Sequence, residues 1–328
     1  MSIEEIEAYL IENRILDDPE VNLLGRGEAN LNYLAVDRDR KYVVRIARDD
    51  VPKQSRFETE HHFMLFIESL GITFAPRSIH YGSTQELHVV DYVEGEDVSI
   101  IDLNETQTKI FVDQLKLLNS ITYEQYLAWC SKSEHTPVKP QTLVSRNKIN
   151  IGDRLLTVRN LAHADSFARK VLVWAESKVD ILDAVQRKAT LRTTFLHDDL
   201  RWNEGGGNIK VAGDGLTFID WELSGFFEDA APEIGDVLGS IPSTVDNAIT
   251  RRLYRSYIEG EDNIDELNSA IRYGLLWSKL GNPLWAAERY CILKDDNHPE
   301  IERYKNLAKS GMKDAESFFE QPLDRQFQ

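Results

Sequence analysis

The segment 208–220, NIKVAGDGLTFID, constrains the fold most, because it predicts a β-hairpin in a half of the chain whose other segments have helical periodicity. Gly213 and Gly215 supply the positive φ angles that a tight turn between two strands requires. The hairpin places Asn208 and Asp220 close together at its open end. We therefore expect helices combined with one short hairpin in this half of the chain.

A loop with the pattern His-x-Asp, HDDLRW, precedes this hairpin. We expect His197 to pack beneath the loop while Asp199 orients an acceptor hydroxyl and takes its proton. The amide oxygen of Asn208 and the carboxylate of Asp220 suit Mg²⁺, which prefers hard oxygen ligands. Together these residues have the layout that phosphoryl transfer requires. The competing interpretations are that the loop is only a polar turn and that Asp220 only caps the turn that follows it.

The N-terminal part predicts a small antiparallel sheet. Residues 20–48 alternate in strand fashion around a turn that contains Gly25, Gly27 and Asn30. Backbone N–H groups in such a turn can lie over the phosphates of a nucleotide. The alternative is that the glycine pair only makes a turn.

Arg45 stands in the middle of the apolar strand VVRIA, where a buried charge requires a partner. A helix is predicted over residues 52–70, and Glu60 on this helix is the candidate partner. Such a pair would fix the helix against the sheet while Arg45 contacts nucleotide phosphates. A surface salt bridge is the alternative interpretation.

The whole pattern predicts an α+β fold, with a small antiparallel sheet and one helix in residues 1–93 and a larger, mainly helical region in residues 94–328. The two parts join near residues 91–95. An extended loop is expected over residues 135–150, and Pro283 is expected to break a helix. Helical periods cover residues 104–130, 155–190, 244–259, 264–290 and 297–320.

Charge and composition limit the partners. The chain has 38 basic and 55 acidic residues and a formal net charge of -17, which repels nucleic acid and anionic membranes. The two cysteines lack the spacing of a metal site or a disulfide framework. Apolar runs of roughly 18 residues are absent and the N-terminus does not resemble a signal peptide, so a cytoplasmic protein is expected. The sequence does not predict an oligomeric state.

Taken in order, LGRGEAN, VVRIA, Glu60, VVDYVEG, LHDDLRW and FIDWE resemble the aminoglycoside phosphotransferase and choline kinase superfamily of protein-kinase-like small-molecule kinases. The resemblance extends over about residues 20–240. It implies a protein-kinase-like bilobal fold that binds ATP or GTP with Mg²⁺. It also implies transfer of the γ-phosphoryl group to a hydroxyl group of a small-molecule acceptor.

The resemblance implies roles for individual residues. Asp199 matches the catalytic base, with His197 in the same loop, and Asp220 matches the metal-binding carboxylate. Arg45 matches the strand cation, a position where the superfamily accepts Arg as well as Lys, and Glu60 matches its helix partner. The expected cofactor-binding positions are Gly25, Gly27, Asn30, Arg45, Glu60 and the backbone of Asp91, Tyr92 and Val93.

The catalytic loop departs from the superfamily pattern. The family Asn usually stands five residues beyond the catalytic Asp, and Glu204 occupies that position here. A single insertion makes Asn208 the metal ligand, whereas Asn203 requires a deletion and an insertion; Asn208 is preferred, and Asn203 and Glu204 stay open. Asp198 replaces the commoner glycine and is a second candidate for the base. Glu233 resembles the acidic residue that braces this loop.

Three functions compete. A metabolite or antibiotic kinase is favoured, because the 12 residues between Asp220 and Glu233 are too few for the peptide platform of a protein kinase. A nucleotide-binding regulator without turnover, a pseudokinase, is the alternative, and a self-phosphorylating protein kinase is the third. The acidic charge and the tryptophans favour an amine-bearing alcohol or sugar as acceptor. The sequence determines neither the acceptor nor the choice between ATP and GTP.

Overall fold

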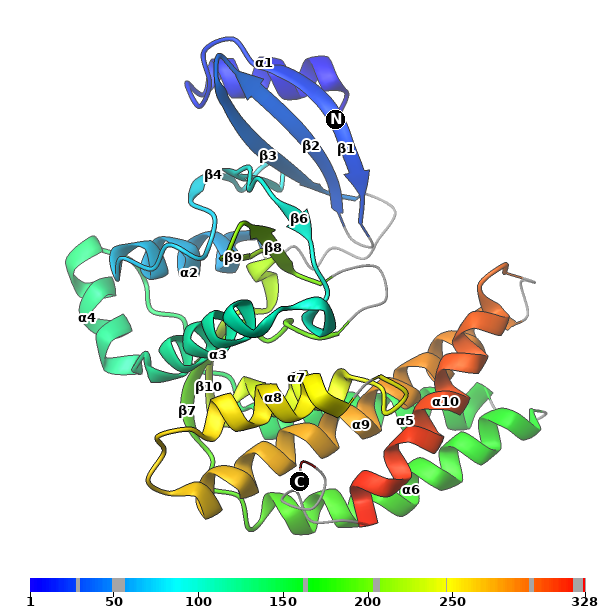
Figure 1. Cartoon of the computed structure of the whole chain (residues 1–328). Helices are drawn as coiled ribbons and strands as arrows, with labels where there is room; N and C mark the ends of the chain where they lie inside the picture. The colour runs from blue at the N-terminus through cyan, green and yellow to red at the C-terminus, as the bar shows by residue number, and fades with distance from the viewer. Residues whose placement is uncertain are drawn as a thin grey trace. The chain divides into compact units, whose positions relative to one another are not determined.

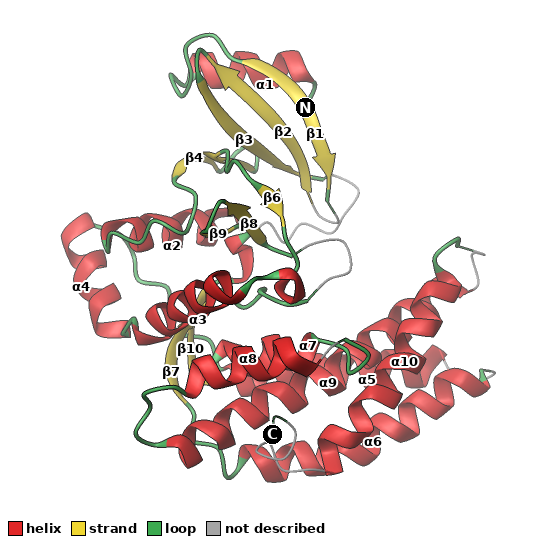
Figure 2. Cartoon of the chain, viewed as in Figure 1, coloured by secondary structure: helices red, strands yellow, loops and turns green. Residues whose placement is uncertain are grey.

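The computed structural model describes residues 1–27, 30–48, 57–161, 165–202, 207–245, 247–294, 298–320 and 327, without the side chains of residues 143–149 and 247. The chain divides into two compact units, whose elements are labelled in Figure 1 and coloured by type in Figure 2. Unit 1 comprises Met1–Val98 and Asn208–Ser224, and unit 2 comprises Ser99–Gly207 and Gly225–Gln328. The boundary after residue 93 that the sequence predicts stays a prediction.

Unit 1 is built on an antiparallel sheet of five strands in the order β1-β2-β3-β5-β4. Two helices also belong to this unit, α1 (Ile3–Glu12) and α2 (Phe57–Ser69). The first residues of the helix predicted over 52–70 lie outside the described residues. The strands are β1 (Glu20–Arg26), β2 (Asn30–Asp37), β3 (Arg40–Ala47), β4 (Ser78–Gly82) and β5 (Leu87–Asp91).

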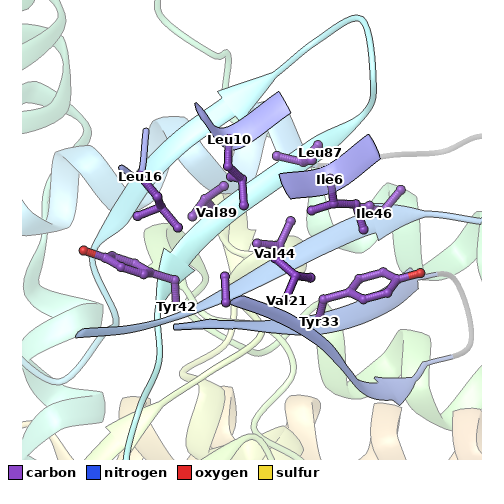
Figure 3. Packing of buried hydrophobic residues seen from close by; sticks show 11 residues of the cluster. Ile6, Leu10, Leu16, Val21, Tyr33, Tyr42, Val44, Ile46, Leu87 and Val89 are labelled. Carbon is purple, nitrogen blue, oxygen red and sulfur yellow. The ribbon is translucent and has the colours of Figure 1, made fainter. Parts of the chain in front are cut away.

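Helix α1 packs on one face of this sheet, as Figure 3 shows. A capping box at Ser2 begins the helix, and Ile6 and Leu10 on its inner face are fully buried. They pack in one hydrophobic cluster with strand residues such as Val44. Because side chains alternate along a strand, Arg45 points to the opposite face of β3. The α1 cluster therefore fixes the strand that carries this cation.

The predicted hairpin is present and belongs to unit 1, where a third short strand extends it. Gly95, which leads into that third strand, has a φ of +130°, and a Cβ atom at this position would lie 2.5 Å from the carbonyl oxygen of Val211. Only glycine fits so close an approach. The strands are β6 (Glu96–Asp97), β8 (Ile209–Ala212) and β9 (Gly215–Phe218).

Unit 2 is mostly helical, as predicted, but several helix boundaries differ. The period predicted over 155–190 covers the end of one helix and the whole of the next. The helical period predicted over 104–130 forms two helices, because the side chain of Thr122 accepts the N–H of Gln125 in a capping box that starts a new helix. The extended loop predicted over 135–150 is wrong in its second half, where α5 begins at Leu143. The helices are α3 (Glu105–Ser120), α4 (Tyr123–Ser133), α5 (Leu143–Leu161), α6 (Ser166–Gln186), α7 (Glu233–Ser240), α8 (Asn247–Ile258), α9 (Ile264–Leu293) and α10 (Ile301–Glu320).

Helix α9 continues through Pro283, so the predicted break is wrong. Pro283 is buried, and a Cβ atom on Gly311 of α10 would lie 2.7 Å from its Cγ atom. Close packing between α9 and α10 thus overrides the local preference of proline. Within the described ranges, no helix is both long enough and apolar enough to cross a membrane.

Two strands of unit 2 are absent from the sequence prediction. Strands β7 (Arg192–Leu196) and β10 (Gly225–Ala230) pair antiparallel and flank the hairpin in the sequence. The buried residues of each strand, including Phe195 and Phe227, form consecutive runs rather than alternate positions. Such runs lack the two-residue period from which a strand is recognised. Strand β7 leads directly into the His-x-Asp loop.

Candidate active site

Arg45 is the centre of a cluster of carboxylates in unit 1. Its Nη1 atom donates to Glu60 Oε1 at 2.6 Å, and its Nη2 atom donates to Asp220 Oδ1 at 2.6 Å. Glu222 Oε2 lies 3.4 Å from the same Nη2 atom. The Arg45 side chain is 10% exposed and that of Glu60 is 2% exposed. The predicted pair of Arg45 and Glu60 is therefore present, and it is buried rather than a surface salt bridge.

The charges in this cluster keep Arg45 and Glu60 ionised. Burial disfavours the charge of Arg45, but Glu60, Asp220 and Glu222 outweigh burial and raise its pKa. Burial likewise opposes the charge of Glu60, but Arg45 and His88 lower its pKa to about 2. Burial and the neighbouring Asp220 raise the pKa of Glu222. Arg45 is thus a permanent cation, held in place by a carboxylate beneath the site.

A chain of buried polar side chains supports Glu60 from the sheet. His88 Nδ1 lies 3.2 Å from Glu60 Oε2, and His88 Nε2 lies 2.6 Å from Ser78 Oγ. The Ser78 hydroxyl also lies 2.6 Å from His61 Nδ1. With His88 neutral, its Nδ1–H donates to Glu60 and its Nε2 accepts from Ser78. Both oxygens of Glu60 are therefore fixed, one by Arg45 and the other by His88.

Asp220 has an unusual backbone conformation, with φ 63° and ψ 63° in the left-handed region. A non-glycine residue pays on the order of 1 kcal/mol for this conformation, and such residues cluster at functional sites. The following residue, Trp221, begins the short helix η2 (Trp221–Leu223) and donates its backbone N–H to Glu60 Oε1 at 3.1 Å. The turn thereby directs the Asp220 carboxylate towards Arg45.

Asn208 lies beside Asp220 at the open end of the hairpin, as the sequence predicts. Its carbonyl oxygen accepts the N–H of Ile219 at 2.9 Å. Asn203 and Glu204, the other candidate ligands, lie outside the described residues. Mg²⁺ is commonly held by one or two carboxylates together with substrate phosphates. The oxygen donors of Asp220 and Asn208 fit such an ion.

No group of three or more His, Cys, Asp or Glu side chains suited to a metal occurs within the part of the chain that the structure describes. Glu222, two residues after Asp220, was not singled out from the sequence. Glu222 therefore adds a third side chain with oxygen atoms to Asp220 and Asn208.

The turn between β1 and β2 is closed by the Gly27 N–H, which donates to the carbonyl oxygen of Asn30 at 2.8 Å. Gly25 lies at an irregularity in the pairing of the two strands. The side-chain Nδ2 atom of Asn30 donates to Glu222 Oε2 at 3.4 Å. The structure therefore links the predicted phosphate-binding turn to the carboxylates around Arg45.

Two backbone N–H groups of the connection after β5 already have partners within unit 1. The N–H of Asp91 donates to the carbonyl oxygen of Arg77 at 2.9 Å, and that of Tyr92 donates to Lys41 at 3.1 Å. Both donors are therefore used within the sheet. A nucleotide base would have to use carbonyl oxygens of this segment or the N–H of Val93.

The His-x-Asp loop lies in unit 2 and is braced by Glu233 at the start of α7. Glu233 Oε2 accepts the N–H of His197 at 3.0 Å, and Oε1 accepts the N–H of Asp198 at 2.8 Å. Asp198 is 8% exposed and has a left-handed φ of 66°, whereas Asp199 is only half-buried. His197 is fully buried. Burial and the charge of Asp198 raise the pKa of Glu233 to about 8, although both N–H donors oppose the shift.

Arg201 adds a cation to this loop that was not predicted. Its Nε atom donates to Asp236 Oδ2 at 2.6 Å, and the charge of Asp236 raises the pKa of Arg201. The carboxylates of Asp198 and Asp199 contribute to the same shift. Arg201 is thus held electrostatically near both candidate bases.

Comparisons with known proteins identify a matching family and similar folds. The sequence model of a family described as the phosphotransferase enzyme family matches residues 20–267. No curated protein matches the chain by sequence.

Solved structures are similar in fold at low sequence identity. A choline/ethanolamine kinase family protein from Mesorhizobium loti has 16% identity and a TM-score of 0.68, covering 100% of this chain and 98% of that chain. Spectinomycin phosphotransferase in complex with ADP and spectinomycin has 12% identity and a TM-score of 0.64, covering 98% and 99%. Choline kinase from Cryptosporidium parvum Iowa II has 14% identity and a TM-score of 0.64, covering 100% of both chains. These similarities confirm the predicted α+β, kinase-like fold.

Proposed function

Because the chain belongs to the phosphotransferase enzyme family, as its motifs suggest, we propose that it transfers the γ-phosphoryl group of ATP or GTP to a hydroxyl group of a small molecule. The observation that carries this proposal is the cluster in unit 1, where Glu60 holds Arg45 against Asp220. Phosphoryl transfer depends on positioning and charge stabilisation, for which a fixed cation and a metal-binding carboxylate are the main requirements.

The residues of unit 1 take the nucleotide roles in this proposal. Arg45 contacts the phosphates, and Asp220 with Asn208 holds Mg²⁺, with Asn203 as the alternative to Asn208. The metal, when bound, neutralises charge on the transferred phosphoryl group. In the structure Arg45 pairs with Asp220 at 2.6 Å. Bound Mg²⁺ would therefore replace Arg45 as the charge partner of Asp220, and bound phosphates would replace Asp220 as a charge partner of Arg45.

Asp199 is the proposed base in unit 2. Its greater exposure compared with Asp198 supports this assignment, because a base must reach the acceptor hydroxyl. The backbone of Asp198 is occupied in holding the loop against Glu233. His197, which is fully buried, supports the loop from beneath.

A small acceptor is favoured over a peptide. The segment between Asp220 and Glu233 consists largely of η2 and of β10, which pairs with β7. No long surface segment follows the metal-binding residue on which a peptide could lie. The named kinases of choline and ethanolamine and the spectinomycin phosphotransferase act on amine-bearing compounds. We therefore place amine-bearing alcohols and sugars first among the acceptors.

The test is ADP or GDP formation with Mg²⁺ and either nucleotide, across amino alcohols, sugars, amino sugars, hydroxy amino acids and aminoglycosides. Asp199→Asn should lower acceptor-dependent turnover by about 10²–10⁴-fold with little change in nucleotide affinity. Asp198→Asn is the matched control, and selective loss in that variant would move the base to Asp198. Asp220→Ala should weaken the Mg²⁺ dependence of nucleotide binding. Nucleotide binding without turnover for any acceptor would support the regulatory alternative.

A further inference from the structure

A basic groove lies in unit 2 at one end of the helices α6, α9 and α10, which run side by side in Figure 1. Its volume is about 520 Å³, within the range of small-molecule binding sites. Three lysines line it, Lys170 from α6 and Lys305 and Lys309 from α10, together with the rings of Phe167 and Tyr290. None of these residues belongs to the proposed catalytic machinery.

The groove concentrates positive charge in a chain whose net charge is -17. Among the described residues, no carboxylate forms an ion pair with Lys170 or Lys309, and Lys305 has only a 3.5 Å contact with Glu302. Further along the same two helices the charges are balanced, since Lys178 of α6 pairs with Glu316 of α10 at 2.6 Å. The lysines of the groove therefore differ from Lys178, whose charge is balanced by a carboxylate of the neighbouring helix.

The one carboxylate that lines the groove, that of Asp165, is used in the protein structure. Its Oδ1 atom accepts the backbone N–H groups of Phe167 and Ala168 at 2.8 and 3.0 Å. Its Oδ2 atom accepts the hydroxyl of Tyr290 at 2.7 Å. Asp165 thus caps α6 and fixes the Tyr290 ring, and it leaves the ammonium groups available to a ligand.

Two of the three ammonium groups lie over aromatic rings that line the groove. Lys305 Nζ lies 5.6 Å from the centre of the Tyr290 ring, and Lys309 Nζ lies 5.6 Å from that of Phe167. The two rings pack edge to face, with centres 5.3 Å apart. The result is a rigid apolar wall with cations above it, a combination suited to an anion that carries a flat ring.

We propose that this groove is a binding site for a small phosphorylated compound with a planar ring, its phosphate on the three lysines and its ring on Phe167 and Tyr290. Lys is a common phosphate ligand and acts as a point charge. The site is distinct from the proposed nucleotide site, which is formed by residues of unit 1, and it does not depend on the proposed activity.

Calorimetric titration of the full chain with phenyl phosphate tests the proposal, with inorganic phosphate and benzyl alcohol as probes that lack the ring or the anion. Phenyl phosphate should bind at one site, at least about tenfold tighter than either control probe. The double variant Lys305→Gln/Lys309→Gln should weaken binding by about tenfold or more. Lys132→Gln, at an exposed lysine on α4 that does not line the groove, carries the same type of charge change and should bind as the wild type does.

Three results would overturn the proposal. The first is equal affinity in the wild type and the double variant, or no measurable binding at all. The second is loss of binding in Asp220→Ala with retention in the double variant, which would place the probe at the proposed nucleotide site. The third is binding of an acidic peptide such as oligoglutamate without binding of phenyl phosphate, which would make the groove a protein-docking surface.

Discussion

Replacement of Glu60 by Gln should destabilise the protein strongly, although the two side chains have nearly the same shape. Burial raises the cost of the Glu60 charge, yet Arg45, His88 and the Trp221 N–H together lower its pKa from 4.5 to about 2. Each pKa unit corresponds to about 1.4 kcal/mol. Ionised Glu60 therefore contributes about 3 kcal/mol to the free energy of unfolding, in the range expected when one partner of a buried pair is removed.

The contribution of Glu60 to the free energy of unfolding should decrease as pH falls. The pKa of Glu60 is lower in the folded chain than in the unfolded chain, so its contribution is complete above pH 4.5 and is lost as pH falls towards 2. The free-energy difference between wild type and Glu60→Gln should stay constant from pH 7 to about 4.5 and then narrow by about 1.4 kcal/mol per pH unit.

Urea unfolding of the full chain, followed by circular dichroism, measures the difference. Hydrogen exchange of the Trp221 amide, which donates to Glu60, reports the same loss at the site itself. Glu58→Gln is the matched control, because Glu58 is exposed on the same helix. A loss below about 1 kcal/mol at pH 7, or a difference that does not shrink in acid, would refute the assigned ion pair.

Further substitutions test the packing at a glycine and a second buried ion pair. Gly95→Ala should lower the free energy of unfolding by about 2 kcal/mol or more, because this position combines a positive φ with a close carbonyl contact. Gly152→Ala, in open space within α5, should instead be neutral or stabilising by up to about 1 kcal/mol. Equal melting temperatures for the two variants would contradict this prediction. Lys279→Met should cost about 3 kcal/mol in urea unfolding, because it leaves the Asp314 carboxylate without its buried partner. Lys279→Met/Asp314→Leu should recover most of that loss, and a double variant as unstable as the single one would argue against the pair.

The sequence predicts those contacts of the site that depend on residues close together in the chain. A cation in an apolar strand requires a partner, and the predicted helix that follows the strand offers Glu60 to Arg45. The tight hairpin, whose turn uses a positive φ at Gly213 but not at Gly215 as predicted, similarly brings Asn208 and Asp220 together. Their chemical roles stay predictions.

Other contributions depend on contacts that no local pattern reveals. His88 contacts Glu60 of α2 from strand β5, 28 positions further along the chain. Nothing in the sequence around His88 distinguishes it from a surface histidine. Glu222 and Arg201 stand beside predicted residues, but only the fold shows which carboxylate or cation each one faces. The capping box at Thr122, in contrast, was present in the sequence as a Thr-x-x-Gln signal.

The division of unit 1 between two distant stretches of sequence has a consequence for synthesis of the chain. The Phe218 N–H donates to the carbonyl oxygen of Phe74, and Val98 donates to Ile209, so the hairpin is an integral part of the N-terminal unit. A ribosome completes residues 1–98 roughly 10 s before it adds residue 224. Throughout that interval Arg45 and Glu60 lack the segment that completes their surroundings. Residues 1–98 are therefore synthesised well before the segment that completes their unit, so unit 1 reaches its final structure only after the hairpin has been made.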